Sequence, residues 1–179
     1  LCRDIAQKFN NDFNADNFFR IPEPLIQKEF SRIMSLRDGS KKMSKSDPSD
    51  YSRIMLTDTA ENITQKLKKA KTDPEPLPEN KEGLINRPEA ENLISIFASL
   101  QENKIENVIN DYAGKEFSVF KKDLAELSVS KLEPITSEMN KLMSDISYID
   151  SVLNSGKEKA ISVAEPVLNK TKEIVGFLL

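Results

Sequence analysis

The chain has 179 residues with a formal net charge of −3, so its bulk charge is not that of a polycationic nucleic-acid-binding protein. The mean hydropathy is −0.49 and no run of about 18 apolar residues occurs, which argues against a membrane-spanning helix. The length suffices for one good domain or two small ones, and the single cysteine, Cys2, allows neither an internal disulfide nor a Cys-based zinc site.

The first thirteen residues predict an amphipathic helix. Apolar side chains recur at every fourth position, at Leu1, Ile5, Phe9 and Phe13. The Asn- and Asp-rich run 10–17 favours turns, and the prolines in 21–24 require an extended connector. We therefore expect the helix to end before residue 14.

A short apolar segment, residues 32–36, predicts a β-strand bounded by the turn signal Asp38-Gly39. A lone strand is not stable, so we expect it to belong to the parallel sheet of a doubly wound fold. Ligands of such sheets bind at the carboxyl ends of the strands. The chain leaves that end directly into the next segment.

Residues 41–48, here called the lysine loop, have the composition of an anion-binding site. Lys41, Lys42 and Lys45 supply positive charge, and Ser44 and Ser46 supply hydroxyl groups. An ammonium about 4 Å from a phosphate oxygen gains on the order of 4 kcal/mol at an effective dielectric constant near 20. The segment is too polar to be core, and we interpret it as a loop that binds a polyphosphate.

A helix is expected after the lysine loop, with Asp58 as its N-cap and Glu61 completing a capping box. Its apolar face consists of Ile63, Leu67 and Ala70, and it should stop near Thr72. Residues 73–87 contain three prolines and one glycine with almost no apolar periodicity, so they predict a linker or an ordered surface loop, and we place the candidate domain boundary there.

From residue 88 onward the pattern is helical almost to the end of the chain. Pro88 suits a first helical position, Gly114 suits a left-handed cap, and Pro134 should bend or break a long helix. We interpret the apolar stripes as the core of a helical bundle. They comprise Leu93, Ile94, Phe97, Leu100, Ile105, Val108, Ile109, Tyr112, Phe120, Leu124, Leu127, Leu132, Ile135, Met139, Leu142, Met143, Ala160, Val163, Val167, Thr171, Ile174 and Leu178.

Any contact with RNA must use local basic patches, since the chain as a whole is acidic. Three are visible: residues 32–45, the four lysines in 66–71, and Lys121-Lys122. For the second and third, a solvated helix face is the expected interpretation. Only the first coincides with a motif.

The order Lys42-Met43-Ser44-Lys45-Ser46 is letter for letter the KMSKS signature of class I aminoacyl-tRNA synthetases. The following Asp47-Pro48 resembles the form that this signature takes in tryptophanyl-tRNA synthetases. Residues 32–36, 70–73, 112–115 and 120–125 also fall in the order typical of the bacterial family. The resemblance covers essentially the whole chain.

This resemblance implies a mainly α fold that begins with the remnant of a Rossmann-like, doubly wound catalytic domain in residues 1–72. A linker at 73–87 and a helical domain of the anticodon-binding type at 88–179 would follow. Class I synthetases pair the loop with a His-Ile-Gly-His-type signature, and this chain has no histidine. We therefore expect it to be the carboxyl-terminal half of the enzyme, inactive alone.

The implied function is that of a tryptophan–tRNA ligase, which activates tryptophan with ATP and transfers it to tRNA(Trp). By resemblance, Lys42 and Lys45 are catalytic and stabilise the departing pyrophosphate. The ATP-binding residues would be Ile33, Lys42, Met43, Ser44, Lys45 and Ser46. Mg²⁺ should accompany ATP without an identified protein ligand, and no residue is assigned to tRNA.

The resemblance also implies a homodimeric, cytoplasmic bacterial enzyme, with an organellar matrix as the less favoured location. Two alternatives remain open. One is a helical RNA-binding or adaptor module derived from a synthetase, which keeps the loop without activity. The other is the sibling synthetase for tyrosine, because the choice of amino acid does not reside in these residues.

Overall fold

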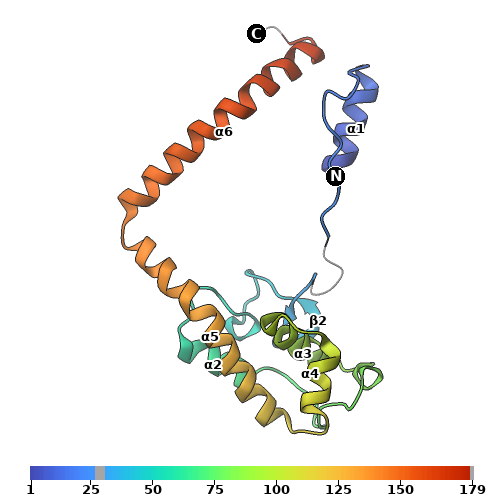
Figure 1. Cartoon of the computed structure of the whole chain (residues 1–179), viewed down its shortest axis with the longest axis vertical. Helices are drawn as coiled ribbons and strands as arrows, with labels where there is room; N and C mark the ends of the chain where they lie inside the picture. Colours follow the sequence, from blue (N-terminus) through green and yellow to red (C-terminus); the bar gives the residue numbers. More distant parts are fainter. Residues whose placement is uncertain (27–30, 178–179) are drawn as a thin grey trace. The chain divides into compact units, whose positions relative to one another are not determined.

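The computed structural model describes residues 1–26 and 31–177, which form two compact units. One unit combines Leu1–Ile26 with Asp145–Leu179, and the other is Gln27–Ser144. Figure 1 shows the elements of each unit. These compact units do not test the predicted division into a catalytic remnant at 1–72, a linker at 73–87 and a helical domain at 88–179, which stays a prediction.

In the first unit, helix α1 (Cys2–Asp12) forms as the spacing of four predicts. The ring of Phe9 lies 4.8 Å from the ring of Phe19 and 5.9 Å from that of Phe18. The Asn10 amide, which is buried, donates to the carbonyl oxygen of Phe19 over 2.8 Å and accepts from its N–H over 3.0 Å. The turn-rich stretch is thereby folded back onto α1.

The second helix of this unit, α6 (Ile146–Val175), begins at an Asp145 cap that accepts from the Tyr148 N–H over 2.9 Å. It ends at Gly176, whose φ of 88° is left-handed and favours glycine. None of residues 146–175 is buried. The apolar stripe expected between Ala160 and Ile174 is therefore largely exposed, and Leu178 lies outside the described residues.

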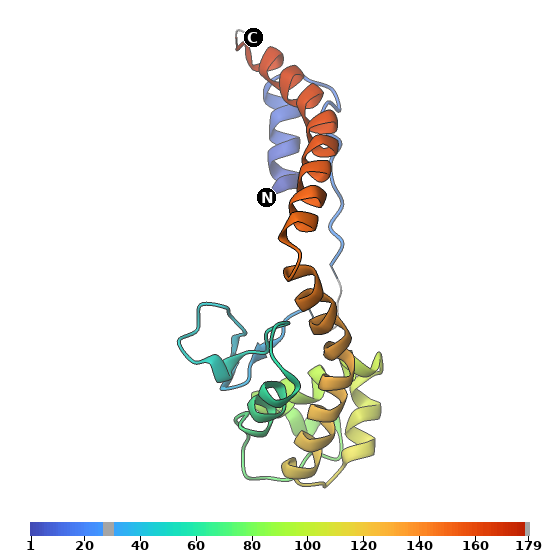
Figure 2. The ribbon, with the colours of Figure 1, turned by 90° about the vertical axis from the view of Figure 1, so that its left-hand side faces the viewer.

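The core lies in the second unit, where α2 (Ala60–Lys68), α3 (Pro88–Gln101) and α4 (Ile105–Tyr112) gather around the first half of α5 (Phe117–Met143) (Figure 2). Helices α2 and α3 both contact α5, and α3 also contacts α4. The side chains that this cluster buries most completely include Ile63, Leu67, Leu93, Ile94, Val108, Phe120 and Leu124. Most of these were expected from their helical spacing.

Three predictions about helix ends and breaks have different outcomes. The cap of α2 is Thr59, whose hydroxyl accepts from the Asn62 N–H over 3.2 Å, so the expected Asp58 cap is wrong by one residue. Gly114 follows α4 with a φ of 69°, as expected. Helix α5 continues unbroken through Pro134, and the chain turns only after residue 143.

Residues 73–87, expected to be a linker or an ordered surface loop, are packed against the helices of the second unit. The guanidinium of Arg87 binds the Asp73 carboxylate through two bonds of 2.9 and 2.6 Å. Leu77 is buried and exchanges backbone hydrogen bonds with the turn at residues 114–115, and Leu84 is buried in the short 3₁₀ helix η2 (Lys81–Leu84). The prolines prevent a helix in this segment, but the segment is still ordered by its contacts with the rest of the unit.

The strand predicted at 32–36 exists as β1 (Met34–Ser35), and it pairs antiparallel with β2 (Asp38–Lys42). The turn lies at residues 36–37 rather than at Asp38-Gly39. A strand therefore occupies residues 38–42, which we expected to be a loop. Within the two described ranges no third strand joins this hairpin.

Candidate phosphate-binding loop

The hairpin that carries the lysine loop is fixed to the amino-terminal end of α3. The Asn92 side chain, buried in α3, accepts from the Met34 N–H and donates to the Met34 carbonyl, both over 2.9 Å. Gly39 lies so close to α3 that a Cβ there would meet the Pro88 carbonyl carbon at 2.5 Å. Space, and not a left-handed backbone, is what requires glycine at this position.

A local hydrogen-bond cluster stiffens β2 where the chain approaches the loop. Asp38 accepts from the Ser40 hydroxyl over 2.6 Å and forms an ion pair with Lys41 at 3.2 Å. These hydrogen bonds, that of Ser40 first, lower the pKa of the Asp38 carboxyl to about 2. Lys41 is thus paired within the protein.

The next residues form the exposed part of the loop. The N–H of Met43 donates to the Ile33 carbonyl over 3.0 Å, which ends the hairpin. Beyond it the hydroxyl groups of Ser44 and Ser46 lie 3.0 Å apart and bond to each other. Lys42 and Lys45 are exposed, and neither ammonium has a hydrogen-bond or ion-pair partner among residues 1–26 and 31–177.

Five of the six predicted ATP-binding residues are consecutive, and Ile33 joins them through its bond to Met43. Met43, Ser44 and Lys45 line a cavity of about 380 Å³, whose other lining residues include Met55 and Met139. Lys42, Ser46 and Ile33 do not line this cavity. Ile33 is half-buried, and its side chain packs against the hydrophobic core of the second unit.

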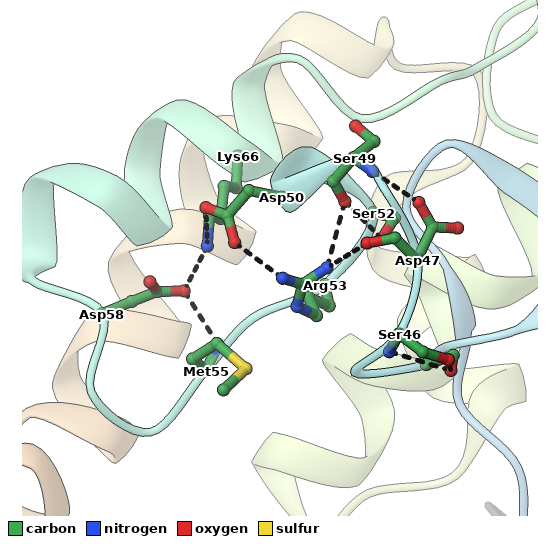
Figure 3. Close-up of polar contacts among 10 residues, drawn as sticks. Ser46, Asp47, Ser49, Asp50, Ser52, Arg53, Met55, Asp58 and Lys66 are labelled. Carbon is green, nitrogen blue, oxygen red and sulfur yellow. Dashed lines mark hydrogen bonds and ion pairs between the residues drawn. The ribbon is translucent and has the colours of Figure 1, made fainter.

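The downstream end of the loop is held by Arg53, as Figure 3 shows. Its guanidinium donates to the carbonyl oxygen of Asp47 over 2.9 Å and to that of Ser49 over 3.3 Å. The Asp47 carboxylate in turn accepts from the Ser49 N–H over 2.8 Å. Arg53 therefore fixes the backbone on both sides of Pro48.

Behind Arg53 lies a buried lysine. Lys66 of α2 is only 3% exposed, and its ammonium binds Asp50 at 2.8 Å and Asp58 at 2.6 Å (Figure 3). Asp50 also pairs with Arg53 at 3.2 Å. Burial lowers the pKa of Lys66, but the hydrogen bonds to Asp50 and Asp58 outweigh burial and raise it above its ordinary value. The lysine is therefore charged at neutral pH.

The sequence interpretation missed Lys66, because it placed this lysine in a solvated basic patch. The signal was present in the spacing: Lys66 falls on the same helical face as Ile63, Leu67 and Ala70. The expected solvated face is only partly correct: Lys68 and Lys69 are exposed, whereas Lys66 is buried and Lys71 pairs with Glu89 at 2.8 Å.

Lys121 of the third patch is also withdrawn from solvent. It is half-buried and donates to the Ala70 carbonyl over 2.7 Å and to the Thr72 hydroxyl over 3.1 Å. Burial lowers its pKa. In the lysine loop, Lys42 and Lys45 thus present two ammonium groups without protein partners, as far as the described residues extend.

Two unpartnered ammonium groups and two hydroxyl groups within five residues of an exposed loop are suited to bind a phosphate chain. A sequence model described as "tRNA synthetases class I (W and Y)" matches residues 1–133. Because this match covers well over half of the chain, the chain belongs to that family of class I synthetases.

Curated relatives carry the more particular name "Tryptophan--tRNA ligase". The protein of Caulobacter vibrioides is 58% identical over 99% of this chain and 52% of its own length. The protein of Mesorhizobium japonicum is 50% identical, over 99% of this chain and 55% of its own. The chain therefore spans about half the length of the curated relatives it matches.

Solved structures agree on the fold. The crystal structure of tryptophanyl-tRNA synthetase from Mycoplasma pneumoniae superimposes with a TM-score of 0.82 at 25% identity, over 98% of this chain and 52% of that one. The synthetase from Campylobacter jejuni, at 23% identity and a TM-score of 0.58, shows the fold alone. The mainly α architecture with a small remnant of sheet is thus a known arrangement.

The described residues also bear on membrane spanning and on metal binding. No helix in the described part of the chain is both long and apolar enough to cross a membrane. Across the same residues, no cluster of three or more Asp, Glu, Cys or His side chains could hold a metal ion.

Proposed function

We propose that this chain provides the phosphate-binding loop and the adjoining helices of a tryptophan–tRNA ligase. Membership of the class I family supports the reaction type, and relatives named tryptophan–tRNA ligase at 50–58% identity support tryptophan over tyrosine. Such an enzyme joins tryptophan to ATP as an adenylate and transfers it to tRNA(Trp). We also propose, from the family resemblance, that the enzyme is a cytoplasmic homodimer.

One observation carries the proposal furthest: Lys42 and Lys45 are exposed and have no partner in the described structure. Lys41, the neighbouring residue, pairs instead with the Asp38 carboxylate. The two remaining ammonium groups repel each other unless an anion lies between them. A triphosphate supplies that anion.

The proposed chemistry follows from where charge develops. The tryptophan carboxylate attacks the α-phosphorus of ATP, the bond to the bridging oxygen breaks, and pyrophosphate leaves with added negative charge. Lys42 and Lys45 stabilise that charge more in the transition state than in the ground state. Ser44 and Ser46 bond to each other in the free loop and can turn to donate to phosphate. Mg²⁺ enters with ATP as part of the substrate.

Lys42→Ala and Lys45→Ala, introduced into the enzyme that contains this sequence, test the proposal. Each should lower the rate of ATP–pyrophosphate exchange by roughly 100-fold, as the loss of one transition-state contact does. The dissociation constant of tryptophan should stay unchanged, because the lysines act on the leaving group. Exchange kinetics and tryptophan binding by calorimetry measure the two quantities.

Lys41→Ala is the matched control, since Lys41 lies in the same loop but pairs with Asp38. Its exchange rate should stay within a factor of about two of the parent enzyme, as expected for an exposed ion pair. Unchanged exchange in both the Lys42 and Lys45 variants would contradict the proposed function. A parent enzyme that binds tRNA without any exchange would instead indicate the adaptor alternative.

A further inference from the structure

A buried lysine in α2 lies behind the lysine loop. The side chain of Lys66 is 4% exposed and occupies a position on the apolar face that Ile63 and Leu67 share. An apolar residue would complete that face, and replacing buried charge by apolar side chains is often neutral or stabilising. Packing alone therefore does not account for a lysine here.

The contacts of Lys66 lead to the lysine loop in two steps. Its ammonium binds the Asp50 Oδ2 atom at 2.8 Å, and the Oδ1 atom of the same carboxylate binds Arg53 at 3.2 Å. Arg53 then donates to the Asp47 carbonyl over 2.9 Å (Figure 3). A continuous chain of ionic and hydrogen bonds thus joins α2 to the backbone of the loop.

The second carboxylate on Lys66 fixes the ammonium. Asp58 is mostly buried, binds Lys66 at 2.6 Å and accepts from the Met55 N–H over 2.8 Å. The Arg53 guanidinium is held by its terminal nitrogens, because its Nε atom is buried and has no partner in the described structure. Arg53 therefore depends on Asp50, and Asp50 depends on Lys66.

At its upstream end the loop is anchored by the Met43 bond to Ile33. Between these two anchors, the serine side chains bond within the loop, as far as the described residues show. The positions of Lys42 and Lys45 relative to bound phosphate are then set by where these anchors hold the backbone. Loss of the downstream anchor would leave Lys45 tethered from one side.

We propose that Lys66 is a positioning residue, which holds the lysine loop through Asp50 and Arg53 so that Lys45 meets the phosphates of ATP. The kinetic part of this inference rests on the proposed function, whereas the structural part does not. Two experiments separate them.

The first experiment is limited trypsin proteolysis of the 179-residue chain, with the fragments identified by mass. In Lys66→Met, cleavage after Lys45 should accelerate several-fold while cleavage after Lys104, the exposed N-cap of α4, stays at the parent rate. Lys66→Arg should restore slow cleavage after Lys45. Lys121→Met is the matched control, because it removes a half-buried lysine that bonds away from the loop.

Two outcomes would overturn the structural claim: no change at Lys45, or equal acceleration at Lys45 and Lys104, which indicates general unfolding. Lys66→Met leaves a buried carboxylate without its cation and can prevent folding. The double variant Lys66→Met/Asp58→Asn removes that charge and should still show the acceleration at Lys45.

The second experiment measures ATP–pyrophosphate exchange in the enzyme that contains this sequence. Lys66→Met should lower kcat by about 10- to 100-fold, as small misplacements of a catalytic group do, with tryptophan binding unchanged. Lys66→Arg should recover most of the rate, and Lys121→Met should retain it. If Lys42→Ala lowers exchange but Lys66→Met does not, the positioning role is wrong and the proposed function stands. If neither does, the proposed function is wrong.

Discussion

At the scale of single residues, four lysines that look alike in the sequence have three different electrostatic states. Lys41 is paired with Asp38, whereas Lys42 and Lys45 are exposed without partners in the described ranges. Lys66, which resembled a solvated lysine, is buried between two carboxylates. The distinction depends on which acidic side chains the fold brings near, and it determines which ammonium groups can bind a ligand.

Gly39 is the residue whose replacement should most directly disturb the base of the loop. In Gly39→Ala the new Cβ would meet backbone atoms of residues 88–89 at 2.5 to 2.6 Å, so the hairpin or α3 must shift. Overpacking of this kind costs about 1–3 kcal/mol of the free energy of unfolding. Urea denaturation measures it. Gly156→Ala is the control, because its Cβ would meet nothing within 4 Å. Equal effects of the two substitutions would contradict this account.

At the scale of elements, the lysine loop is a short exposed segment between two anchors, the Met43 bond to Ile33 and the Arg53 bond to Asp47. Its only apolar side chain, Met43, is half-buried. Few contacts cross from residues 44–46 to the rest of the chain, and segments of this kind open at low free-energy cost.

We expect the amides of residues 44–46 to exchange hydrogen rapidly without nucleotide and to become protected when an ATP analogue is bound to the enzyme. Phosphate removes the repulsion between Lys42 and Lys45 and adds charge-assisted hydrogen bonds, so the bound state favours the ordered loop. Hydrogen exchange followed by mass spectrometry measures the change. The buried helix α3 serves as the internal reference, since its protection should not depend on nucleotide. Protection of the loop that is the same with and without nucleotide would mean that it does not bind phosphate.

At the scale of the whole molecule, the two compact units differ in what they bury. The core cluster is drawn from the second unit, with Phe120 and Leu124 of α5 fully buried against α2 and α3. In the first unit, residues 146–175 contribute no buried side chain. An isolated helix in water is marginally stable, because its stability in proteins comes mostly from packing of its apolar face.

Hydrogen exchange in the 179-residue chain should therefore separate the units. Amides of α6 should exchange much faster than those around Leu93 and Phe97 in α3. Exchange of both helices at the same slow rate would show that α6 is packed in solution. A parallel measurement at several protein concentrations controls for self-association, which would protect the exposed apolar side chains of α6.

The sequence alone determined the helices and the motif. Apolar spacing of three and four placed α2, α3 and α4 within a few residues, because helical periodicity is a local property. The KMSKS letters of residues 42–46 indicated the family, which the match over residues 1–133 confirmed. The roles of Lys42 and Lys45 in catalysis stay predictions.

Only the tertiary structure decided the pairings between distant segments. The second strand, the packing of residues 73–87 and the burial of Lys66 each depend on partners 8 to 58 residues away in the chain, such as Asp58 for Lys66 and Asn92 for Met34. A charged side chain has no local pattern that reveals its partner, because its energy is set by whichever opposite charge and low-dielectric surroundings the fold supplies. Without Asp50 and Asp58 nearby, Lys66 would be the exposed lysine that the sequence suggested.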